Sequence, residues 1–407
     1  MRVLIPVRGA HGHIRPMVPL AGALQRAGHE VRFACRESMA PVVASAGLTG
    51  IGVFPDARFP GSAGELAVTS SAELTRLLAF TEEWTPDVVL REWAETAGLV
   101  VAVEREVPCV VAGLKVRPGP PEGGAHPCVA LMEDGLRGLL TGGGGGLGFD
   151  LAKVAARHAR IAAREGGVVA SIDLNSLFGD VWLSLYPPAF GFPGTPPLAN
   201  EHHFRPPVFD VLRGAGLPRW WDELGERPIV LVTLGTTVNE TGGLLERIIA
   251  AAAPLDADLV VTTGPDRDPA ALGLLPQNVH AARYIPLSLA MARASAAITH
   301  GGFGTTMAAL THGVPVVSIP VNGDQPVNAR RCADLGVGLA YGEGTGVLGT
   351  TEPQSDPVVL RGMLRRVLAE RSFRAAAQRL AADIAALPTI DNAVPVIESL
   401  VDSYRTA

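Results

Sequence analysis

The stretch that decides the fold is Ala296–Pro315, "AAITHGGFGTTMAALTHGVP". It begins as a short apolar strand and continues, after a cluster of glycines, as a helical pattern. Gly301, Gly302 and Gly304 let the backbone turn sharply and expose its N–H groups. Free N–H groups at a helix N-terminus favour an anion. The segment therefore predicts a strand–turn–helix unit that binds phosphate, with His300 as a further donor. A tight turn without a ligand is the alternative.

Two further turns in the same half of the chain support a ligand. "TLGTT" (Thr233–Thr237) follows an apolar run, and "PVNGDQPVNA" (Pro320–Ala329) precedes a helical pattern. In the second turn a carboxylate, Asp324, and an amide, Gln325, stand side by side, and both suit the hydroxyls of a sugar. A diphosphate beside a sugar-binding loop describes a nucleotide-sugar donor. A polar turn that caps the next helix is the simpler interpretation.

Outward from this segment, strand-like runs and helical patterns alternate along both halves of the chain. That alternation is typical of parallel sheets covered on both faces. The predicted strands of the first half are Val3–Val7, Glu30–Cys35, Thr49–Phe54, Asp87–Arg91 and Cys109–Ala112. Those of the second half are Ile229–Leu234, Leu259–Thr263, Val279–Arg283, Ala297–Thr299 and Val316–Ile319. The final predicted helices are Asp356–Glu370, Phe373–Ala386 and Ala393–Tyr404.

The alternation breaks off in a proline-rich stretch near the middle and then restarts. We predict an α/β protein with two doubly wound, Rossmann-like domains. The first spans residues 1–207, a linker spans 208–227, the second domain spans 228–388, and a C-terminal helix lies within 389–407. Ligands of such sheets bind at the carboxyl ends of the strands. Two domains facing each other would place their strand-end loops around one cleft.

Composition excludes several classes. The chain has 407 residues and a net charge of −6, with no basic block, which argues against nucleic acid as a partner. Its cysteines form no CxxC pair, so they predict reduced, mostly buried thiols rather than a zinc knuckle or disulfides. No apolar run reaches membrane-spanning length, and "VLIPV" is too short for a signal-peptide core. We therefore expect a soluble, cytoplasmic protein without stable membrane insertion.

Motifs of other nucleotide-dependent and metal-dependent enzymes are missing. The GxGxxG dinucleotide fingerprint fails at "RGAHGHIRP", and GxxxxGK[ST] is absent. The strings "DAD" (Asp256–Asp258) and "DRD" (Asp266–Asp268) match a cation-binding DxD pair, but we interpret both as solvated turns. A zinc pair at His11 and His13 would need further ligands that the sequence does not offer. We predict no metal site.

The stretch "RGAHGHIRP" (Arg8–Pro16) can supply a base. An acceptor hydroxyl is a poor nucleophile until a nearby imidazole takes its proton, and a carboxylate that fixes the imidazole tautomer strengthens the base. Glu92 lies just past a predicted strand in "PDVVLREWAE", and Glu95 is the alternative three residues later. By this chemistry either His11 or His13 would serve, and a histidine that only shapes the start of a helix is the plainer alternative.

The longer segment Thr299–Gly338, "THGGFGTTMAALTHGVPVVSIPVNGDQPVNARRCADLGVG", resembles the donor-binding signature of the family 1 glycosyltransferases. The start of the chain, "MRVLIPVRGAHGHIRPMVPLAGALQRAGHEVRFA", resembles that of the bacterial natural-product members. The likeness spans nearly the whole chain and is weakest from about Pro118 to Pro228. It implies the GT-B fold, with an acceptor-binding N-terminal domain, a donor-binding C-terminal domain and a last helix that crosses back to the first domain.

The resemblance also assigns site residues. His13 matches the family's HxxP element and would be the general base, with Glu92 as its partner where many members have aspartate. His300 would contact the donor diphosphate, and Asp324 and Gln325 would hold the sugar. The remaining donor-binding assignments are Gly235, Thr236, Ile285, Gly302, Gly304 and Thr305.

The function implied is an inverting, metal-independent glycosyltransferase that needs no cofactor. Its donor would be a dTDP-deoxysugar or UDP-glucose. Its acceptor would be a hydroxyl of a hydrophobic natural product such as a polyketide or macrolide aglycone, in secondary-metabolite biosynthesis. The acceptor pocket is expected near Phe54–Leu66, Val116–Ala130 and the glycine-rich segment before Phe149. A nucleotide-sugar epimerase and a non-catalytic helper protein are the alternatives, and a homodimer is left open.

Overall fold

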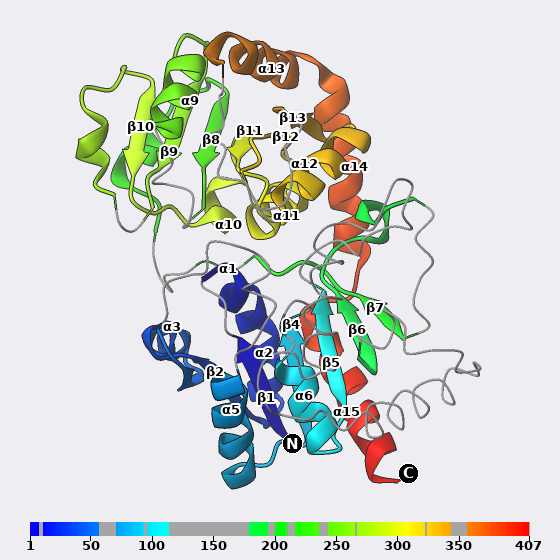
Figure 1. Ribbon diagram of the computed structural model, residues 1–407. Coiled ribbons are helices and arrows are strands. Elements are labelled where there is room, and N and C mark those ends of the chain that lie inside the picture. Colours follow the sequence, from blue (N-terminus) through cyan, green and yellow to red (C-terminus); the bar gives the residue numbers. More distant parts are fainter. Residues whose placement is uncertain are drawn as a thin grey trace. The chain divides into compact units, whose positions relative to one another are not determined.

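The computed structural model divides into two compact units, each built around one parallel sheet (Figure 1). Unit 1 comprises Met1–Tyr186, Phe192–Arg205 and Pro388–Ala407, and unit 2 comprises Pro187–Gly191 and Pro206–Leu387. The structure describes residues 1–7, 11–56, 71–92, 95, 97–113, 179–193, 200–208, 210, 216–235, 243–264, 267–321, 324–342 and 356–406. Apart from Phe54, Pro55 and Asp56, the segments expected to form an acceptor pocket lie outside these ranges.

The sheet of unit 1 has seven strands in the order β3-β2-β1-β4-β5-β6-β7, all paired in parallel. Their bounds are Arg2–Val7 (β1), Glu30–Arg36 (β2), Thr49–Phe54 (β3), Val88–Glu92 (β4), Cys109–Gly113 (β5), Val181–Ser184 (β6) and Glu201–His203 (β7). The strand order reverses at β1, because β2 lies on one side of it and β4 on the other. Crossovers on the two sides of such a reversal place their helices on opposite faces.

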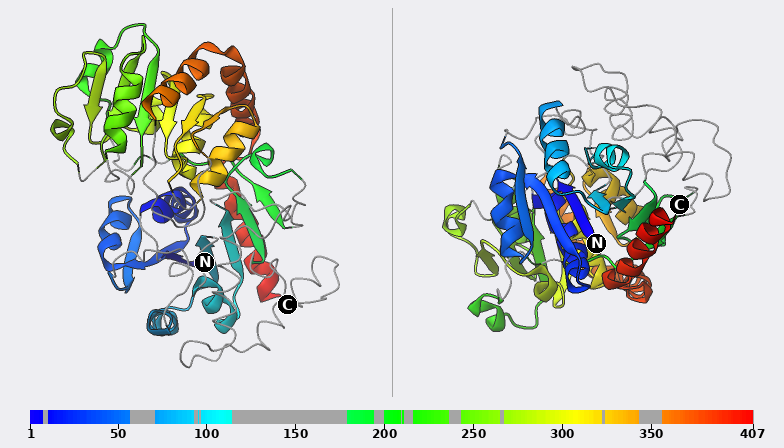
Figure 2. Two further views of the ribbon diagram at one scale, coloured as in Figure 1. Left: turned by 45° about the horizontal axis from the view of Figure 1, so that its top comes forward. Right: turned by 90° about the horizontal axis from the view of Figure 1, so that it is seen from below.

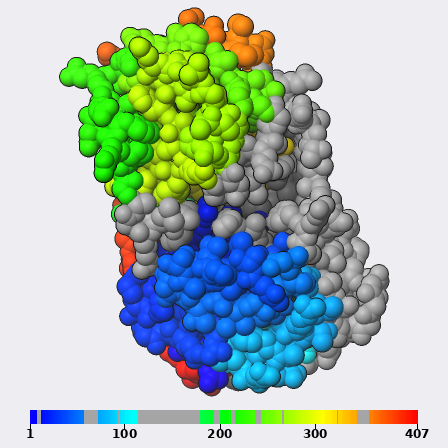
Figure 3. Space-filling model, turned by 90° about the vertical axis from the view of Figure 1, so that its left-hand side faces the viewer, coloured from blue at the N-terminus to red at the C-terminus, as the bar shows by residue number. Residues whose placement is uncertain are grey.

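The central strands of unit 1 are buried along their whole length, as strands covered on both faces are. A cluster of buried apolar residues packs one face against α5 (Ser71–Glu83) and α6 (Ala97–Glu104). The helical segments along the first crossovers are α1 (His11–Ile14), η1 (Arg15–Met17), α2 (Val18–Arg26), η2 (Glu37–Met39) and α3 (Ala40–Ser45). Figure 3 shows one face of unit 1 covered by its N-terminal residues, in blue and cyan.

The sheet of unit 2 has six parallel strands in the order β10-β9-β8-β11-β12-β13. The strands are Ile229–Thr233 (β8), Asp258–Thr262 (β9), Val279–Ala282 (β10), Ala294–Thr299 (β11), Val316–Ser318 (β12) and Gly338–Ala340 (β13). A buried apolar cluster joins one face to α9 (Leu244–Ala252) and α13 (Pro357–Ala369). Helices α11 (Phe303–Thr311) and α12 (Gln325–Asp334) connect β11, β12 and β13, so the same crossover rule places them on the opposite face.

Shorter helical segments complete the description. They are η4 (Pro188–Phe190), η5 (Arg219–Glu223), η6 (Pro269–Leu272), α10 (Leu287–Ala290) and η7 (Ile390–Asn392), and the long helices that end the chain are α14 (Arg371–Ala386) and α15 (Ala393–Arg405). No single helix in the described ranges is both long and apolar enough to cross a membrane. The neighbouring segments Arg371–Ala386 and Ile390–Arg405 form a bent pair. Counted together, this pair is long and apolar enough to span a membrane, by length and composition only.

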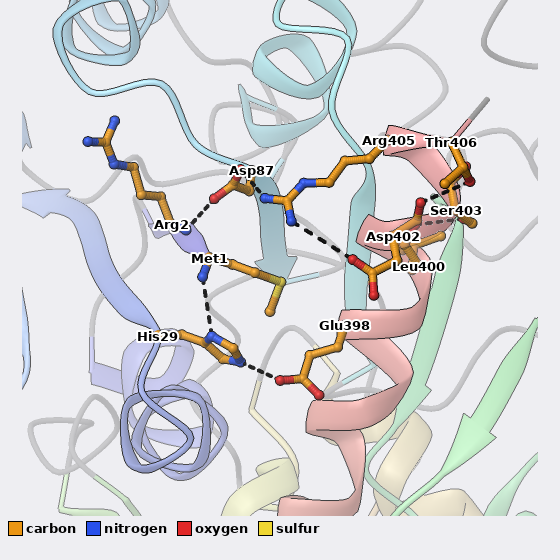
Figure 4. Close-up of polar contacts among 10 residues, drawn as sticks. All are labelled: Met1, Arg2, His29, Asp87, Glu398, Leu400, Asp402, Ser403, Arg405 and Thr406. Atoms are coloured by element: carbon orange, nitrogen blue, oxygen red, sulfur yellow. Dashed lines mark hydrogen bonds and ion pairs between the residues drawn. The ribbon is translucent and has the colours of Figure 1, made fainter.

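Helix α15 is part of unit 1, where it packs against α2 and β6 (Figures 1 and 2). Polar contacts tie it to the start of the sheet (Figure 4). His29 Nε2 lies 3.0 Å from Glu398 Oε1, and Arg405 Nη2 donates to Asp87 Oδ1 at 2.8 Å. Away from this cluster, the Tyr404 hydroxyl donates to Asp180 Oδ1 at 2.5 Å. The last helix therefore closes unit 1 although it follows the whole of unit 2 in the chain.

The predicted fold class is confirmed: both halves are parallel α/β sheets with the doubly wound strand order. Three short strands, β6, β7 and β13, were not predicted. Strand β6 is followed by a proline-rich stretch, β7 is three polar residues, and β13 has only three residues, so none shows a readable period. Each forms because a neighbouring strand edge supplies its hydrogen bonds.

One other expectation needs correction, and the linker predicted at 208–227 stays a prediction. In the described part of that stretch, Trp221 is buried and the Arg293 guanidinium lies 5.6 Å from its ring centroid. Asp258 is not in a solvated turn: it begins β9, is buried, and pairs with Arg227 at 2.5 Å. Asp256 is exposed as expected, and Asp266 lies outside the described residues.

The cysteines that the structure describes are free, buried thiols: Cys35, Cys109 and Cys332. Burial raises the pKa of Cys35 to about 11, with a further contribution from the charge of Asp56, and raises the pKa of Cys332 to about 12. Both thiols stay protonated at neutral pH. This agrees with the expected reduced state; Cys128 lies outside the described residues.

The close approach of α6 to the sheet provides a stability test. An ideal Cβ on Gly98 would lie 2.7 Å from Pro6 Cγ, 3.1 Å from Val89 Cγ1 and 3.2 Å from Arg91 Cβ. Gly98→Ala should therefore lower the free energy of unfolding by about 1–3 kcal/mol, as overpacking does. Urea unfolding at neutral pH measures the change.

The matched control is Gly362→Ala in α13, where an added Cβ meets nothing within 4 Å. There the substitution should raise stability by about 0.5–1 kcal/mol, because alanine is the better helix former. Equal midpoints for Gly98→Ala and the wild type would contradict the close packing of α6.

Candidate functional site

In each unit, central predicted site residues end or follow the two strands between which the strand order reverses: His13 and Glu92 in unit 1, and Gly235 and His300 in unit 2. The reversal lies between β1 and β4 in unit 1 and between β8 and β11 in unit 2. The connections leave such a point in opposite directions, which opens a crevice where ligands of doubly wound folds bind. Each unit therefore presents its own candidate half-site.

The half-site of unit 1 joins a histidine and a carboxylate. Strands β1 and β4 pair in parallel, so the helix that follows β1 and the last residue of β4 meet at the same edge. His13, in α1, places Nδ1 3.2 Å from Glu92 Oε2. The Glu92 side chain is 3% exposed and that of His13 is 25% exposed. The structure thus brings together the predicted base and its predicted partner.

Glu95, the alternative partner, does a different job. Its Oε1 accepts a hydrogen bond from the Ala97 N–H at 3.0 Å, at the start of α6. A carboxylate at this position satisfies a free N–H group and complements the helix dipole. The two glutamates therefore have different roles: Glu92 contacts the imidazole of His13, and Glu95 caps helix α6.

This contact defines the chemistry that His13 can perform. Because Glu92 lies against Nδ1, the stable neutral tautomer carries its proton on Nδ1 and donates it to the carboxylate. The lone pair is then on Nε2, which can accept a proton from a substrate hydroxyl. The imidazolium that forms is stabilised by the carboxylate behind it, as in a Ser-His-Asp triad.

Arg91, which was not predicted as a site residue, supports the same edge of the sheet. This residue is 1% exposed, and its Nη1 donates to the Glu95 carbonyl at 3.1 Å and to the Glu92 carbonyl at 3.5 Å. A buried guanidinium thus braces the backbone that carries Glu92. The signal was available, because an arginine in the middle of the buried run "VVLRE" needs buried partners.

The half-site of unit 2 is arranged around His300. Strands β8 and β11 pair with Thr233 opposite Thr299, so the residues that follow each strand are neighbours. An ideal Cβ on Gly235, which has φ +72°, would lie 2.7 Å from His300 Cε1. A Cβ on Gly302 would overlap His300 Nε2. The imidazole of His300 therefore lies between Gly235 and Gly302, and a side chain at either position would collide with it.

Burial sets the protonation state of His300. The side chain is enclosed, and desolvation lowers its pKa from 6.5 to about 4, although the charge of Asp324 and the backbone of Thr233 act in the opposite direction. His300 is consequently a neutral imidazole at pH 7. It can donate a hydrogen bond to a ligand oxygen without bringing a full charge into the site.

The other predicted donor residues surround the same edge. Gly304 and Thr305 lie in the first turn of α11, where N–H groups are free of helical partners. Asp324 is the N-cap residue of α12, and Gln325 Oε1 accepts from the Val321 N–H at 2.8 Å. Ile285 is buried just before α10, and Thr236 lies outside the described residues.

Asn328, in the same Pro320–Ala329 segment, was not assigned to the site from the sequence. It is fully buried in α12, and its amide donates to the Gly301 carbonyl and to Asp324 Oδ2, each at 2.9 Å. Within the described parts of the chain, no group of three or more His, Cys, Asp or Glu residues could hold a metal ion.

Comparison with known proteins identifies the class of enzyme. Residues 246–400 match the family model described as Erythromycin biosynthesis protein CIII-like, C-terminal domain. The whole chain is 27% identical to aklavinone 7-beta-L-rhodosaminyltransferase of Streptomyces galilaeus. That alignment spans 469 residues and covers 100% of this chain and 97% of the relative. Tylactone mycaminosyltransferase of Streptomyces fradiae is 26% identical, over 100% of this chain and 93% of the relative.

A solved structure agrees over the full length. The glycosyltransferase VinC in complex with dTDP superimposes with a TM-score of 0.73 at 27% identity, covering 100% of both chains. The chain belongs to the bacterial natural-product branch of the family 1, GT-B-fold glycosyltransferases. The recognition made from the sequence is confirmed.

The buried imidazole gives this glycosyltransferase a defined pH response. His300 has a folded pKa of about 4 and an ordinary value of 6.5. As the pH falls through 6.5 the unfolded chain takes up this proton first, so stability that is present above that value is lost towards pH 4. At pH 5 the loss from this group should be about 2 kcal/mol.

Urea unfolding of the wild type and His300→Gln at about pH 7 and pH 5 isolates the effect. Because glutamine does not titrate, the variant should lose about 2 kcal/mol less than the wild type between the two conditions. Equal losses would mean that His300 is not held neutral in the folded state.

Proposed function

We propose that this glycosyltransferase moves a deoxysugar from a dTDP-sugar to a hydroxyl of a polyketide- or macrolide-type acceptor, with inversion, in antibiotic biosynthesis. The relatives support the substrate classes, since their names describe transfer of rhodosaminyl and mycaminosyl groups, and VinC binds dTDP. The observation that carries the proposal is the contact between His13 and Glu92 at the strand-order reversal of unit 1. A hydroxyl nucleophile needs such a base.

In the proposed step, His13 Nε2 takes the proton of the acceptor hydroxyl as its oxygen forms a bond to the anomeric carbon. The bond from that carbon to the diphosphate oxygen breaks, and its electron pair leaves with dTDP. Attack occurs opposite to the leaving group, so the configuration inverts. Glu92 stays ionised and stabilises the imidazolium, which returns its proton to solvent.

The donor half-site in unit 2 would stabilise the leaving group. The free N–H groups at the start of α11 and the positive end of its dipole suit a diphosphate. Neutral His300 adds a hydrogen-bond donor in a buried position. These groups supply charge stabilisation of the kind that a cation supplies in other transferases, so we propose a metal-independent reaction. Asp324 and Gln325 would bind the hydroxyls of the sugar.

Removal of the base is the sharpest test of the mechanism. His13→Ala should lower kcat by about 100-fold to 10,000-fold, the usual contribution of general-base catalysis. The affinity for dTDP should not change, because the donor residues belong to unit 2. Turnover assays and calorimetry on the same preparation separate the two effects. A variant that retains the wild-type rate would disprove the assignment of His13.

The two glutamates provide a matched pair of variants. Glu92→Gln removes the charge behind the imidazole and should lower kcat by at least about 10-fold. Glu95→Gln keeps an oxygen that can accept from the Ala97 N–H, so kcat should be close to that of the wild type. If Glu95→Gln has the larger effect on kcat, the partner of His13 has been misassigned.

The donor class is testable without knowing the acceptor. A ligand at 100 times its Kd stabilises the folded state by about 2.7 kcal/mol, which thermal unfolding detects. We expect dTDP and several dTDP-sugars to raise the Tm, and UDP-sugars to raise it less. If none of the dTDP- and UDP-sugars raises the Tm, the proposed function is wrong.

A further inference from the structure

We propose that Asn328 is a positioning residue for the donor sugar: its carboxamide holds the Asp324 carboxylate against the glycine turn, so that the phosphate-binding and sugar-binding parts of the donor site act as one unit. The inference rests on the proposed function, because Asp324 is the residue proposed to bind the sugar. Asn328 itself would touch neither the sugar nor the diphosphate.

The hydrogen bonds of Asn328 connect two separate segments. Its Nδ2 lies 2.9 Å from the Gly301 carbonyl, in the turn after β11, and 2.9 Å from Asp324 Oδ2, at the start of α12. An amide nitrogen has two hydrogens, so each partner receives one. The Asn328 backbone N–H also donates to the Asp324 carbonyl at 3.0 Å.

These partners determine the orientation of the amide. A backbone carbonyl and a carboxylate only accept hydrogen bonds, so the NH₂ end of Asn328 must face both of them. The side chain is fully buried, where an unmade hydrogen bond is costly and a made one is strong. A contact to a charged carboxylate is the stronger of the two.

The two partners depend on Asn328 to different degrees. The glycine turn has other supports: the Gly301 N–H donates to Thr299 Oγ1 at 3.1 Å, and the turn packs so tightly on α12 that a Cβ on Gly301 would lie 2.9 Å from the Gln325 carbonyl oxygen. Among the residues that the structure describes, Asp324 receives its side-chain hydrogen bond from Asn328 alone. Loss of Asn328 should therefore release the carboxylate and leave the turn in place.

The carboxylate that Asn328 fixes also acts on the phosphate side of the site. The charge of Asp324 raises the pKa of His300, against the larger effect of burial. Asp324 is thus close enough to influence the group proposed to contact the diphosphate. Asp324, held in place by Asn328, therefore links the phosphate-binding and sugar-binding parts of the donor site by its charge as well as by its position.

The test compares two affinities rather than one. Calorimetry gives the Kd of dTDP and the Kd of one dTDP-sugar. That sugar is the one that raises the Tm of the wild type most in the thermal unfolding test, in which dTDP-glucose is one of the dTDP-sugars. Asn328→Ala should weaken binding of that dTDP-sugar by about 10-fold, the value of one hydrogen bond to a charged group, and change the Kd of dTDP by less than about 3-fold. Where Asn328→Ala folds poorly, Asn328→Leu fills the same space without a donor.

Asn278 offers a matched control in the same unit. Its Nδ2 also joins two acceptors, the carbonyls of Ala253 at 3.0 Å and Ala257 at 2.9 Å, but it precedes β10 at the opposite edge of the sheet. Asn278→Ala should lower the Tm and leave the ratio of the two Kd values unchanged. Equal weakening of dTDP and the dTDP-sugar by Asn328→Ala would show that its role is only structural, and would overturn the proposal.

A double variant separates positioning from direct contact. If Asn328 acts through Asp324, then Asp324→Ala with Asn328→Ala should bind the dTDP-sugar no worse than Asp324→Ala alone, within about 2-fold. Additive losses would contradict the proposal. Failure of the proposed function has a different signature, because in that case the wild type itself would bind neither dTDP nor any dTDP-sugar.

Discussion

The structure depends on one constraint of parallel sheets: every strand delivers its carboxyl end to the same edge. Where the strand order reverses, neighbouring strands are followed by connections that leave in opposite directions, and polar residues can be placed there without filling the gap. Both sheets of this chain use that point. In unit 1 it brings α1 to the end of β4, and in unit 2 it brings the turn after β8 to the turn after β11.

The same constraint explains how far the sequence could predict the molecule. Long buried strands such as β1 and β8 are continuous apolar runs, and helices such as α13 have a clear period, so the fold class and most elements could be predicted. The short strands β6, β7 and β13 could not, because β7 and β13 are defined by a neighbouring edge and not by their own pattern. The burial of Asp258 also depends on distant residues, since Arg227 and His280 both approach it.

In the candidate site, too, residues with a local sequence signal could be predicted, and residues that depend on distant partners could not. Residues next to glycines or at the end of an apolar run could be singled out, which is why Glu92, His300 and Asp324 were. Supporting residues were harder to find, because Arg91 and Asn328 owe their importance to partners on other segments. A buried polar side chain inside an otherwise regular element is the signal they share. The apolar run around Arg91 hints at that burial in the sequence, whereas the partners of both residues are shown only by the packed structure.

The two central histidines show how environment, rather than residue type, decides a role. His13 keeps a quarter of its side chain exposed and has a carboxylate 3.2 Å from Nδ1, so both its tautomer and its cationic form are supported. His300 is enclosed between glycines, and burial outweighs the charge of Asp324, which keeps it neutral. A base must become charged during the step, whereas a hydrogen-bond donor to a diphosphate need not. The carboxylate beside His13 supports the charge that forms during the step, and burial keeps His300 uncharged.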